Sequence, residues 1–162
     1  MTEFRPMRRK RQQLTDAESI DILRQASSGV LAVLGDEGYP YAVPLSYVYH
    51  EGRLIFHSAV AGHKVDAIRS CDKASFCVIK RDDVRPADFT TVFCSVIAFG
   101  RIRILEDDDS KLEAIRILAR KYSPHETPES TDREIVRGFP HLLMFELQIE
   151  HLTGKKAKEL MS

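Results

Sequence analysis

Short strand-like segments joined by tight turns restrict the fold of this 162-residue chain more than any other feature of its sequence. Hydropathy alternates over residues 41–49 and 143–150, which is the two-residue period of a β-strand with one buried face. Gly35-Asp36-Glu37-Gly38 and His50-Glu51-Gly52 have the composition of turns. Strands that follow one another through such short turns pair antiparallel, so the sequence excludes an array of parallel strands and crossover helices.

A strand pattern occurs in several further segments, and a few others have the spacing of an amphipathic helix. The expected strands cover residues 30–34, 41–49, 53–58, 74–80, 92–105 and 143–150, and the expected helices cover residues 16–27, 63–70 and 108–122. Gly100 predicts a bend or bulge in a long strand, and residues 81–90 and 123–131 are expected to be loops. The fold class is therefore mainly β (α+β), with about six antiparallel strands in a partly closed sheet and a few short peripheral helices.

The net charge of zero is unevenly distributed along the chain. Residues 1–12 carry five basic and one acidic side chain, and residues 153–162 carry three basic and one acidic, which leaves the rest acidic by six charges. A nucleic-acid-binding domain carries its positive charge on the folded surface, so we expect no nucleic-acid partner. The alternative for the basic N-terminus is a nucleic-acid arm. We expect a basic flexible tail over 1–13, a single domain over 14–155, and a basic C-terminal tail over 156–162.

The composition also excludes several classes of protein. No apolar run approaches the 20 or so residues of a membrane span, so no membrane partner is expected. Three cysteines without a C-x-x-C pair indicate a reducing compartment, which predicts a cytoplasmic protein without a disulfide framework or a zinc site. The sequence has no P-loop, dinucleotide fingerprint or nucleophile elbow, and no histidine pair at helical spacing, so no metal site is predicted.

Residues 56–64 form the most informative segment, because a strand ends there and a helix begins after Gly62. A helix N-terminus has unpaired backbone N–H groups and partial positive charge. Ser58, His63 and Lys64 at this point predict an anion pocket suited to a phosphate. A capped strand-to-helix turn with a solvated lysine is the alternative.

Pro44 interrupts a segment with a clear strand pattern, and within sheets proline is confined to edge strands and bulges. The neighbouring backbone at Val43, Leu45 and Ser46 could then face a ligand, although an ordinary edge strand would look the same. Because this strand and the strand before Gly62 are expected to be adjacent, the two features could converge on one cleft. Arg101 and Arg103 indicate either paired charges on a half-exposed strand, or part of an anion site or dimer rim.

Four segments taken together resemble a known family. They are Tyr39-Pro40-Tyr41-Ala42-Val43-Pro44-Leu45-Ser46-Tyr47, Phe56-His57-Ser58-Ala59 with Gly62-His63-Lys64, Ser95-Val96-Ile97-Ala98-Phe99-Gly100-Arg101, and Leu152-Thr153-Gly154-Lys155. In this order and at these separations, they resemble the pyridoxamine 5′-phosphate oxidase-like flavoproteins, and most closely the nitroimidazole-resistance (Nim) branch. The resemblance runs from about residue 8 to residue 158.

The resemblance implies an antiparallel split β-barrel that forms a homodimer, with FMN held at each subunit interface. It places the FMN phosphate on Ser58, His63 and Lys64, the isoalloxazine along residues 43–46, and His57 beside the ring. The implied cofactor-binding residues are Val43, Pro44, Leu45, Ser46, His57, Ser58, Ala59, His63, Lys64 and Ser95. The chain departs from the oxidases proper because residues 41–46 include no basic side chain and the sequence contains no tryptophan, which argues against oxidation of vitamin B6.

These features lead to three hypotheses for the function. The first is a Nim-type reductase of nitroimidazoles or other small electron-poor acceptors, with His57 as proton donor because histidine titrates near neutrality. The second is a non-catalytic flavin- or haem-binding protein that serves as a sensor, carrier or store, with His57 or His63 available to haem iron. The third is a cofactor-free protein that uses its barrel only to dimerise.

Overall fold

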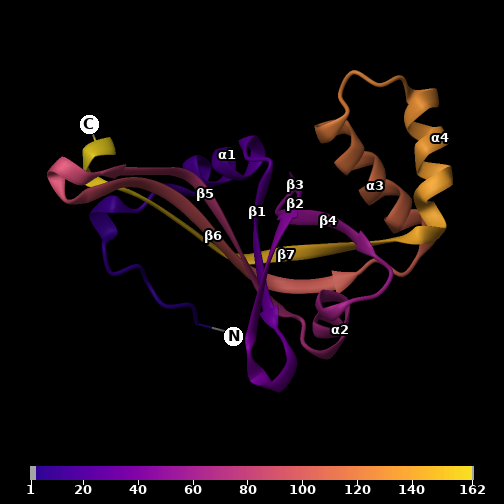
Figure 1. Cartoon of the computed structure of the whole chain (residues 1–162), viewed down its shortest axis with the longest axis horizontal. Helices are drawn as coiled ribbons and strands as arrows, with labels where there is room; N and C mark the ends of the chain where they lie inside the picture. The colour runs from indigo at the N-terminus through magenta and orange to yellow at the C-terminus, as the bar shows by residue number, and fades with distance from the viewer. Residues whose placement is uncertain (1–2, 162) are drawn as a thin grey trace.

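The computed structural model describes residues 3–161, so the extreme ends of the two predicted tails, residues 1–2 and 162, lie outside the described residues (Figure 1). Within residues 3–161 the chain forms seven strands and four α-helices. The strands are β1 (Ser28–Leu34), β2 (Pro40–Ser46), β3 (Val48–His50), β4 (Arg53–Ala59), β5 (Lys73–Arg85), β6 (Thr90–Ile104) and β7 (Leu142–Lys156). The helices are α1 (Asp16–Gln25), α2 (His63–Ser70), α3 (Asp108–Tyr122) and α4 (Pro128–Gly138). None of these helices is both long and apolar enough to cross a bilayer.

All strand pairs are antiparallel, and the strands form one sheet in the order β2-β1-β5-β6-β7-β4-β3. The two outermost strands, β2 and β3, are separated in sequence by Tyr47 alone. A single residue can join the two ends of a sheet only if the sheet curls until its ends meet. The predicted antiparallel split barrel is therefore confirmed, and the split lies between β2 and β3.

Apolar side chains from the strands fill the inside of the barrel or pack against it, and α1 and α2 contribute further ones. Phe56 lies at the centre, stacked on Phe145 and edge-on to Phe76, with ring centroids 5.1 Å away in both cases. A smaller core lies on the outside of β4 and β7, where α3 and α4 cover Ile55 and Met144. The two cores meet across β4, because successive side chains of a strand point to opposite faces.

Several expected elements are present at the expected positions. The predicted helices 63–70 and 108–122 are α2 and α3, and the capping box of Thr15 and Glu18 opens α1. Gly100 lies at a β-bulge between β6 and β7, as predicted. A Cβ at Gly100 would lie 1.9 Å from the carbonyl oxygen of Gln148, so this close crossing requires glycine.

Four expectations about the elements are wrong. The segment 41–49 is two strands, because the chain turns from one edge of the barrel to the other at Tyr47. Residues 81–85 belong to β5 and not to a loop, because β5 and β6 continue past the barrel as a two-stranded arm. The last strand extends beyond residue 150 to Lys156, and the expected loop 123–131 contains the start of α4 at Pro128.

Parts of both predicted tails pack on the barrel. The side-chain amide of Gln12 is buried and donates a hydrogen bond to the carbonyl oxygen of Lys156 at 2.9 Å. Near the other end of the sequence, Ala157 is buried and its backbone N–H donates to the carbonyl of Phe93 at 2.8 Å. Gln12 and Lys156 therefore lie side by side near the arm formed by β5 and β6, whereas the N-terminal end of the chain runs back toward the middle of the sheet (Figure 1).

Candidate functional site

The start of α2 is open to an anion. Gly62 precedes the helix with φ of +136°, a conformation that favours glycine, and no side chain caps the helix N-terminus. The first amides of the helix therefore remain available to an acceptor. The side chains of His63 and Lys64 lie beside them, and Lys64 makes no ion pair with any side chain in residues 3–161. Positive charge and free N–H groups together suit a phosphate.

His63 joins α2 to the hairpin of β1 and β2. Its ring packs on the ring of Tyr41 with centroids 4.1 Å apart, and its Nε2 accepts a hydrogen bond from the backbone N–H of Asp36 at 3.3 Å. The turn approaches so closely that a Cβ at Gly35 would lie 2.9 Å from this nitrogen. The candidate phosphate end of the site and the edge strand β2 are thus held together by direct contact.

β2 is an edge strand, as Pro44 predicts, because it pairs with β1 on one side only. Val43 and Leu45 pack against the barrel core, whereas Pro44 and Ser46 point outward and are exposed. The free side of an edge strand presents unpaired backbone N–H and C=O groups. A planar ligand could use those groups, but the four side chains do not all face one cavity.

The end of β4 presents its residues to two different sides. His57 and Ala59 are exposed, and His57 lies opposite Met144 of β7. Ser58 points into the barrel, is buried, and donates its hydroxyl proton to the carbonyl of Ala59 at 2.9 Å. Its only donor is therefore engaged within the chain, and its role as a phosphate ligand stays a prediction.

Ser95 is not brought to the other candidate residues within one chain. It pairs with Lys155 of β7, whereas Ser58 pairs with Leu143, twelve positions earlier on the same strand. At about 3.3 Å per residue this corresponds to roughly 40 Å measured along the strand. Tyr41 and His63 are in contact and residues 57–59 lead toward α2, whereas Ser95 lies beside the other end of β7.

The structure adds residues that the sequence analysis did not single out. Tyr41 contacts His63, and its place in the alternation with Val43 and Leu45 was the available signal. On the outer face, Arg53 and Arg103 hold the buried carboxylate of Glu146 with N–O distances of 2.7 and 2.8 Å. Arg101 pairs with Asp72 and Glu150, so both arginines of the 101–103 segment are paired charges on a strand face.

The thiols of residues 3–161 are unpaired, and two of them are poorly suited to act as nucleophiles. Cys71, Cys77 and Cys94 are free thiols, and burial raises the pKa of Cys77 and Cys94 above its ordinary value. Both thiols therefore stay protonated at neutral pH and are poor nucleophiles. No group of three His, Cys, Asp or Glu side chains within residues 3–161 is arranged to hold a metal ion.

Solved structures share this fold. A candidate 5-nitroimidazole antibiotic resistance protein from Bacteroides thetaiotaomicron has a TM-score of 0.72 and 18% identity, covering 88% of this chain and 85% of its own. A conserved hypothetical protein from Mycobacterium tuberculosis has a TM-score of 0.79 and 17% identity, with 96% and 92% covered. An FAD- and haem-binding protein from Mycobacterium smegmatis has a TM-score of 0.70 and 18% identity, with 91% and 74% covered. No curated protein sequence matches the chain.

The family is shown by the sequence itself. The family model for pyridoxamine 5′-phosphate oxidase matches residues 15–156, which is most of the chain and includes every strand of the barrel. The chain belongs to the pyridoxamine 5′-phosphate oxidase family.

Proposed function

We propose that this protein is an FMN-dependent reductase of small electron-poor acceptors such as nitroimidazoles, and that it works as a homodimer. The observation that carries the proposal is the contact of His63 with Tyr41, because it joins an open helix N-terminus to a free strand edge. A phosphate suits the first feature, and the polar edge of a planar ring suits the second. The likeness to the candidate nitroimidazole-resistance protein supports the choice of acceptor.

In the proposed complex, Lys64, His63 and the first amides of α2 hold the FMN phosphate. The free backbone edge of Val43, Pro44, Leu45 and Ser46 binds the polar side of the isoalloxazine. Bound FMN supplies the hydride or electron transfer, as flavins do in general. The chain contributes orientation and charge, since donors near the flavin stabilise its anionic reduced form.

His57 is the proposed proton donor. Reduction of a nitro group consumes protons as well as electrons, and His57 is an exposed imidazole at the end of the strand that leads to α2. Its neighbour Ala59 is exposed on the same face of β4, so a substrate has room to approach.

A homodimer accounts for the open shape of the site. Pro44, Ser46, His57 and Ala59 are all exposed in one chain, so a flavin bound there would be covered on one side only. In a two-fold dimer, Ser95 of the partner subunit would complete the other side. This arrangement explains how Ser95 can serve a flavin despite its distance from α2 within its own chain.

The second candidate is a non-catalytic flavin- or haem-binding protein. The likeness to the FAD- and haem-binding protein from Mycobacterium smegmatis favours this alternative. In that case, FAD or haem rather than FMN would be the retained cofactor, and His57 would be the available ligand for the iron. The third hypothesis from the sequence is a protein that binds no cofactor.

The absorbance spectrum of the purified protein after incubation with FMN, FAD or haemin, and after removal of the excess, separates these candidates. We expect stoichiometric FMN, and we expect Lys64→Glu to weaken its binding at least about tenfold, because the new carboxylate lies beside the phosphate. Lys73→Glu, the same exchange at an exposed position on β5, should bind FMN normally. Normal FMN binding by Lys64→Glu would show that the FMN phosphate does not bind at the start of α2.

Catalysis is tested on the FMN-loaded protein after chemical reduction without oxygen. Mixing with a 5-nitroimidazole should reoxidise the wild-type protein. His57→Ala should retain FMN and react more slowly, because the proposed proton donor is removed. Reoxidation of His57→Ala at the wild-type rate at every pH would remove His57 from the mechanism, and no reoxidation of the wild type would favour the non-catalytic alternative.

A further inference from the structure

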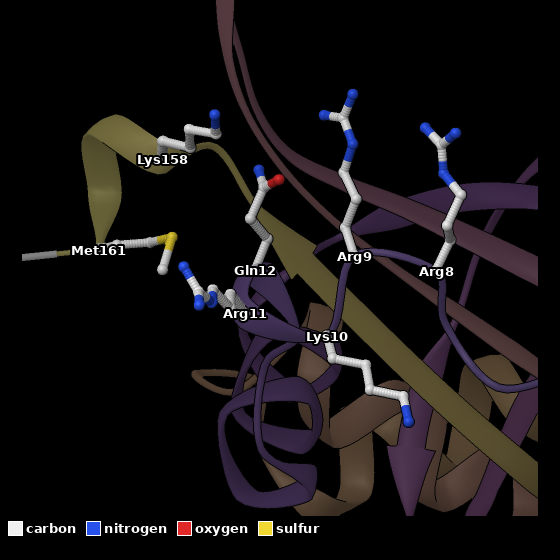
Figure 2. Close-up of a pocket in the computed structure, with 7 residues that line it drawn as sticks. All are labelled: Arg8, Arg9, Lys10, Arg11, Gln12, Lys158 and Met161. Carbon is white, nitrogen blue, oxygen red and sulfur yellow. The ribbon is translucent and has the colours of Figure 1, made fainter.

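Two basic segments from opposite ends of the sequence line one cavity. The cavity has a volume of about 870 Å³, and its lining residues are Arg8, Arg9, Lys10, Arg11, Gln12, Lys158 and Met161. Figure 2 shows Arg8, Arg9 and Gln12 projecting to the same side of the ribbon, with Lys158 beside them and Lys10 turned away. The basic segments are therefore brought together by the fold, with their charged side chains exposed.

The cavity walls are anchored by buried contacts. Gln12 is buried and bonded to the carbonyl of Lys156, and the backbone N–H of Leu14 donates to the carbonyl of Gly154 at 2.8 Å. From the other side, buried Ala157 is bonded to Phe93 of β6. The end of β7 thus lies between the N-terminal segment and β6, and it fixes the positions of both basic segments.

Among residues 3–161, the basic side chains of this cavity have no carboxylate partners. Arg8, Arg9, Lys10, Arg11 and Lys158 form no ion pair with any carboxylate within residues 3–161. Elsewhere the barrel pairs its arginines closely, for example Arg103 with Glu146 at 2.8 Å. Holding like charges together costs free energy unless a counter-charge is present. A bound anion would supply that counter-charge.

A second hollow, which includes two apolar side chains among basic ones, adjoins the first. It has a volume of about 370 Å³, shares Arg8, Arg9 and Gln12 with the larger cavity, and is completed by Met7, Phe93 and Lys155. The ammonium of Lys155 lies 5.4 Å from the centre of the Phe93 ring. Phe93 and Met7 offer a surface on which a planar group can rest, directly beside the arginines.

We propose that this cavity binds a nucleoside diphosphate or triphosphate, with the phosphates on the arginines and Lys158 and the base against Phe93. Guanidinium groups bind phosphate oxygens in pairs, and the two adjoining compartments match the two halves of such a molecule. The larger cavity is open to solvent, since its lining residues other than Gln12 are exposed, and a highly charged ligand can remain partly hydrated there. A nucleic acid fits less well, because residues 13–152 carry 16 basic and 22 acidic side chains and would repel an extended polyanion.

Within one chain this nucleotide site lies apart from the proposed flavin site, although in the proposed homodimer the Ser95 side of one subunit approaches the flavin of the other. Lys155 and the cavity lie at the end of β7 that pairs with Ser95, whereas the start of α2 follows the strand that pairs with the beginning of β7. Nucleotide binding is therefore measured on FMN-free protein. Lys64→Glu, which is expected to weaken FMN binding, should leave nucleotide affinity unchanged.

Calorimetric titration of the full chain with ADP, pyrophosphate and adenosine tests the proposal. We expect ADP to bind more tightly than pyrophosphate, adenosine to bind weakly, and added salt to weaken ADP binding. Arg8→Gln combined with Arg9→Gln should weaken ADP at least about tenfold, because two charged contacts are lost. Arg133→Gln combined with Arg137→Gln removes the same charge from the exposed surface of α4 and should have no effect.

Phe93→Leu tests the base-binding compartment separately. It should weaken the binding of ADP and leave the binding of pyrophosphate unchanged. The proposal is overturned if the two double variants bind ADP equally well, or if wild-type protein does not bind ADP. It is also overturned if a short single-stranded DNA binds through Arg8 and Arg9 while ADP does not, which would identify a nucleic-acid arm instead.

Discussion

Tyr47 is the residue on which the closure of the barrel depends. It is fully buried, and its hydroxyl donates to the carbonyl of Leu23 at 2.6 Å. Its backbone is held from the other side by α3, where Lys121 donates to its carbonyl at 2.9 Å and Tyr122 accepts from its N–H, also at 2.9 Å. The ammonium of Lys121 also lies 4.3 Å from the Tyr47 ring. One residue thus connects α1, α3 and the two edges of the sheet.

The buried phenol of Tyr47 should make the folded state less stable at alkaline pH. Burial, followed by the neighbouring phenolate of Tyr122, raises the pKa of Tyr47 well above its ordinary value. Because the folded state favours the protonated form, the associated stability is fully present below about pH 10 and is lost as pH rises beyond it. Absorbance titration should show that one of the five tyrosines ionises only as the protein unfolds.

Tyr47→Phe is the matched variant for this titration. It should remove the late ionisation and weaken the alkaline loss of stability, at a cost of about 1 kcal/mol at neutral pH from the lost hydrogen bond. Urea unfolding followed by circular dichroism measures that cost. Ionisation of all five tyrosines in the folded wild-type protein would contradict the assignment.

At the residue scale, the sequence predicted part of the candidate site. The open helix start at Gly62 and the edge position of Pro44 follow from local rules, because backbone conformation limits where these two residues can occur. The inward direction of Ser58 was not predicted, because it depends on which face of β4 the core covers. The contact of His63 with Tyr41 is between distant residues and has no local signal.

At the scale of elements, the β-bulge at Gly100 controls how β6 crosses β7. A Cβ at this position would meet both the oxygen and the carbon of the Gln148 carbonyl, at 1.9 and 2.8 Å. Backbone atoms cannot move aside as the end of a side chain can, so Gly100→Ala should cost about 2–4 kcal/mol in the free energy of unfolding.

Gly138 provides the comparison for this substitution. It ends α4 with helical backbone angles, and a Cβ there would make only an ordinary contact with Leu142 at 3.6 Å. Gly138→Ala should therefore be neutral, or stabilising by less than about 1 kcal/mol. Urea denaturation of both variants checks this contrast, and equal destabilisation would show that the crossing at Gly100 adapts.

The two elements that the sequence analysis missed have different physical reasons. The outer part of β5 pairs only with β6, so both faces are exposed and no alternation of hydropathy marks it. The start of α4 was obscured by its proline content. Pro128 nevertheless stands in the first turn of the helix, where proline is well tolerated, and Thr127 caps the amide of Ser130 at 3.1 Å. The spacing of threonine and proline was a usable signal for this helix.

At the scale of the whole molecule, the arm of β5 and β6 leaves apolar side chains without partners. Val84 is 68% exposed and Phe89, at its tip, is 99% exposed. Apolar residues concentrated in this way usually mark an interface. We expect the arm to contribute to the proposed homodimer.

Sedimentation at micromolar protein tests this interface. The wild-type protein should be a dimer, and Val84→Lys should shift it toward monomer by placing a charge in the contact. Val136→Lys changes a residue of similar exposure on α4 and should leave the dimer intact. A monomeric wild-type protein that retains FMN would exclude a flavin site shared between subunits.

The position of β7 in the sheet also has a consequence for how the protein is made. β7 is synthesised after every other strand, yet it lies between β6 and β4. While the chain is still on the ribosome, the sheet can exist only as two separate pieces, β2-β1-β5-β6 and β4-β3. Their facing edges stay open until residue 142 and its successors emerge. Completion of this barrel therefore waits for β7, and nascent chains are most exposed to mispairing just before it emerges.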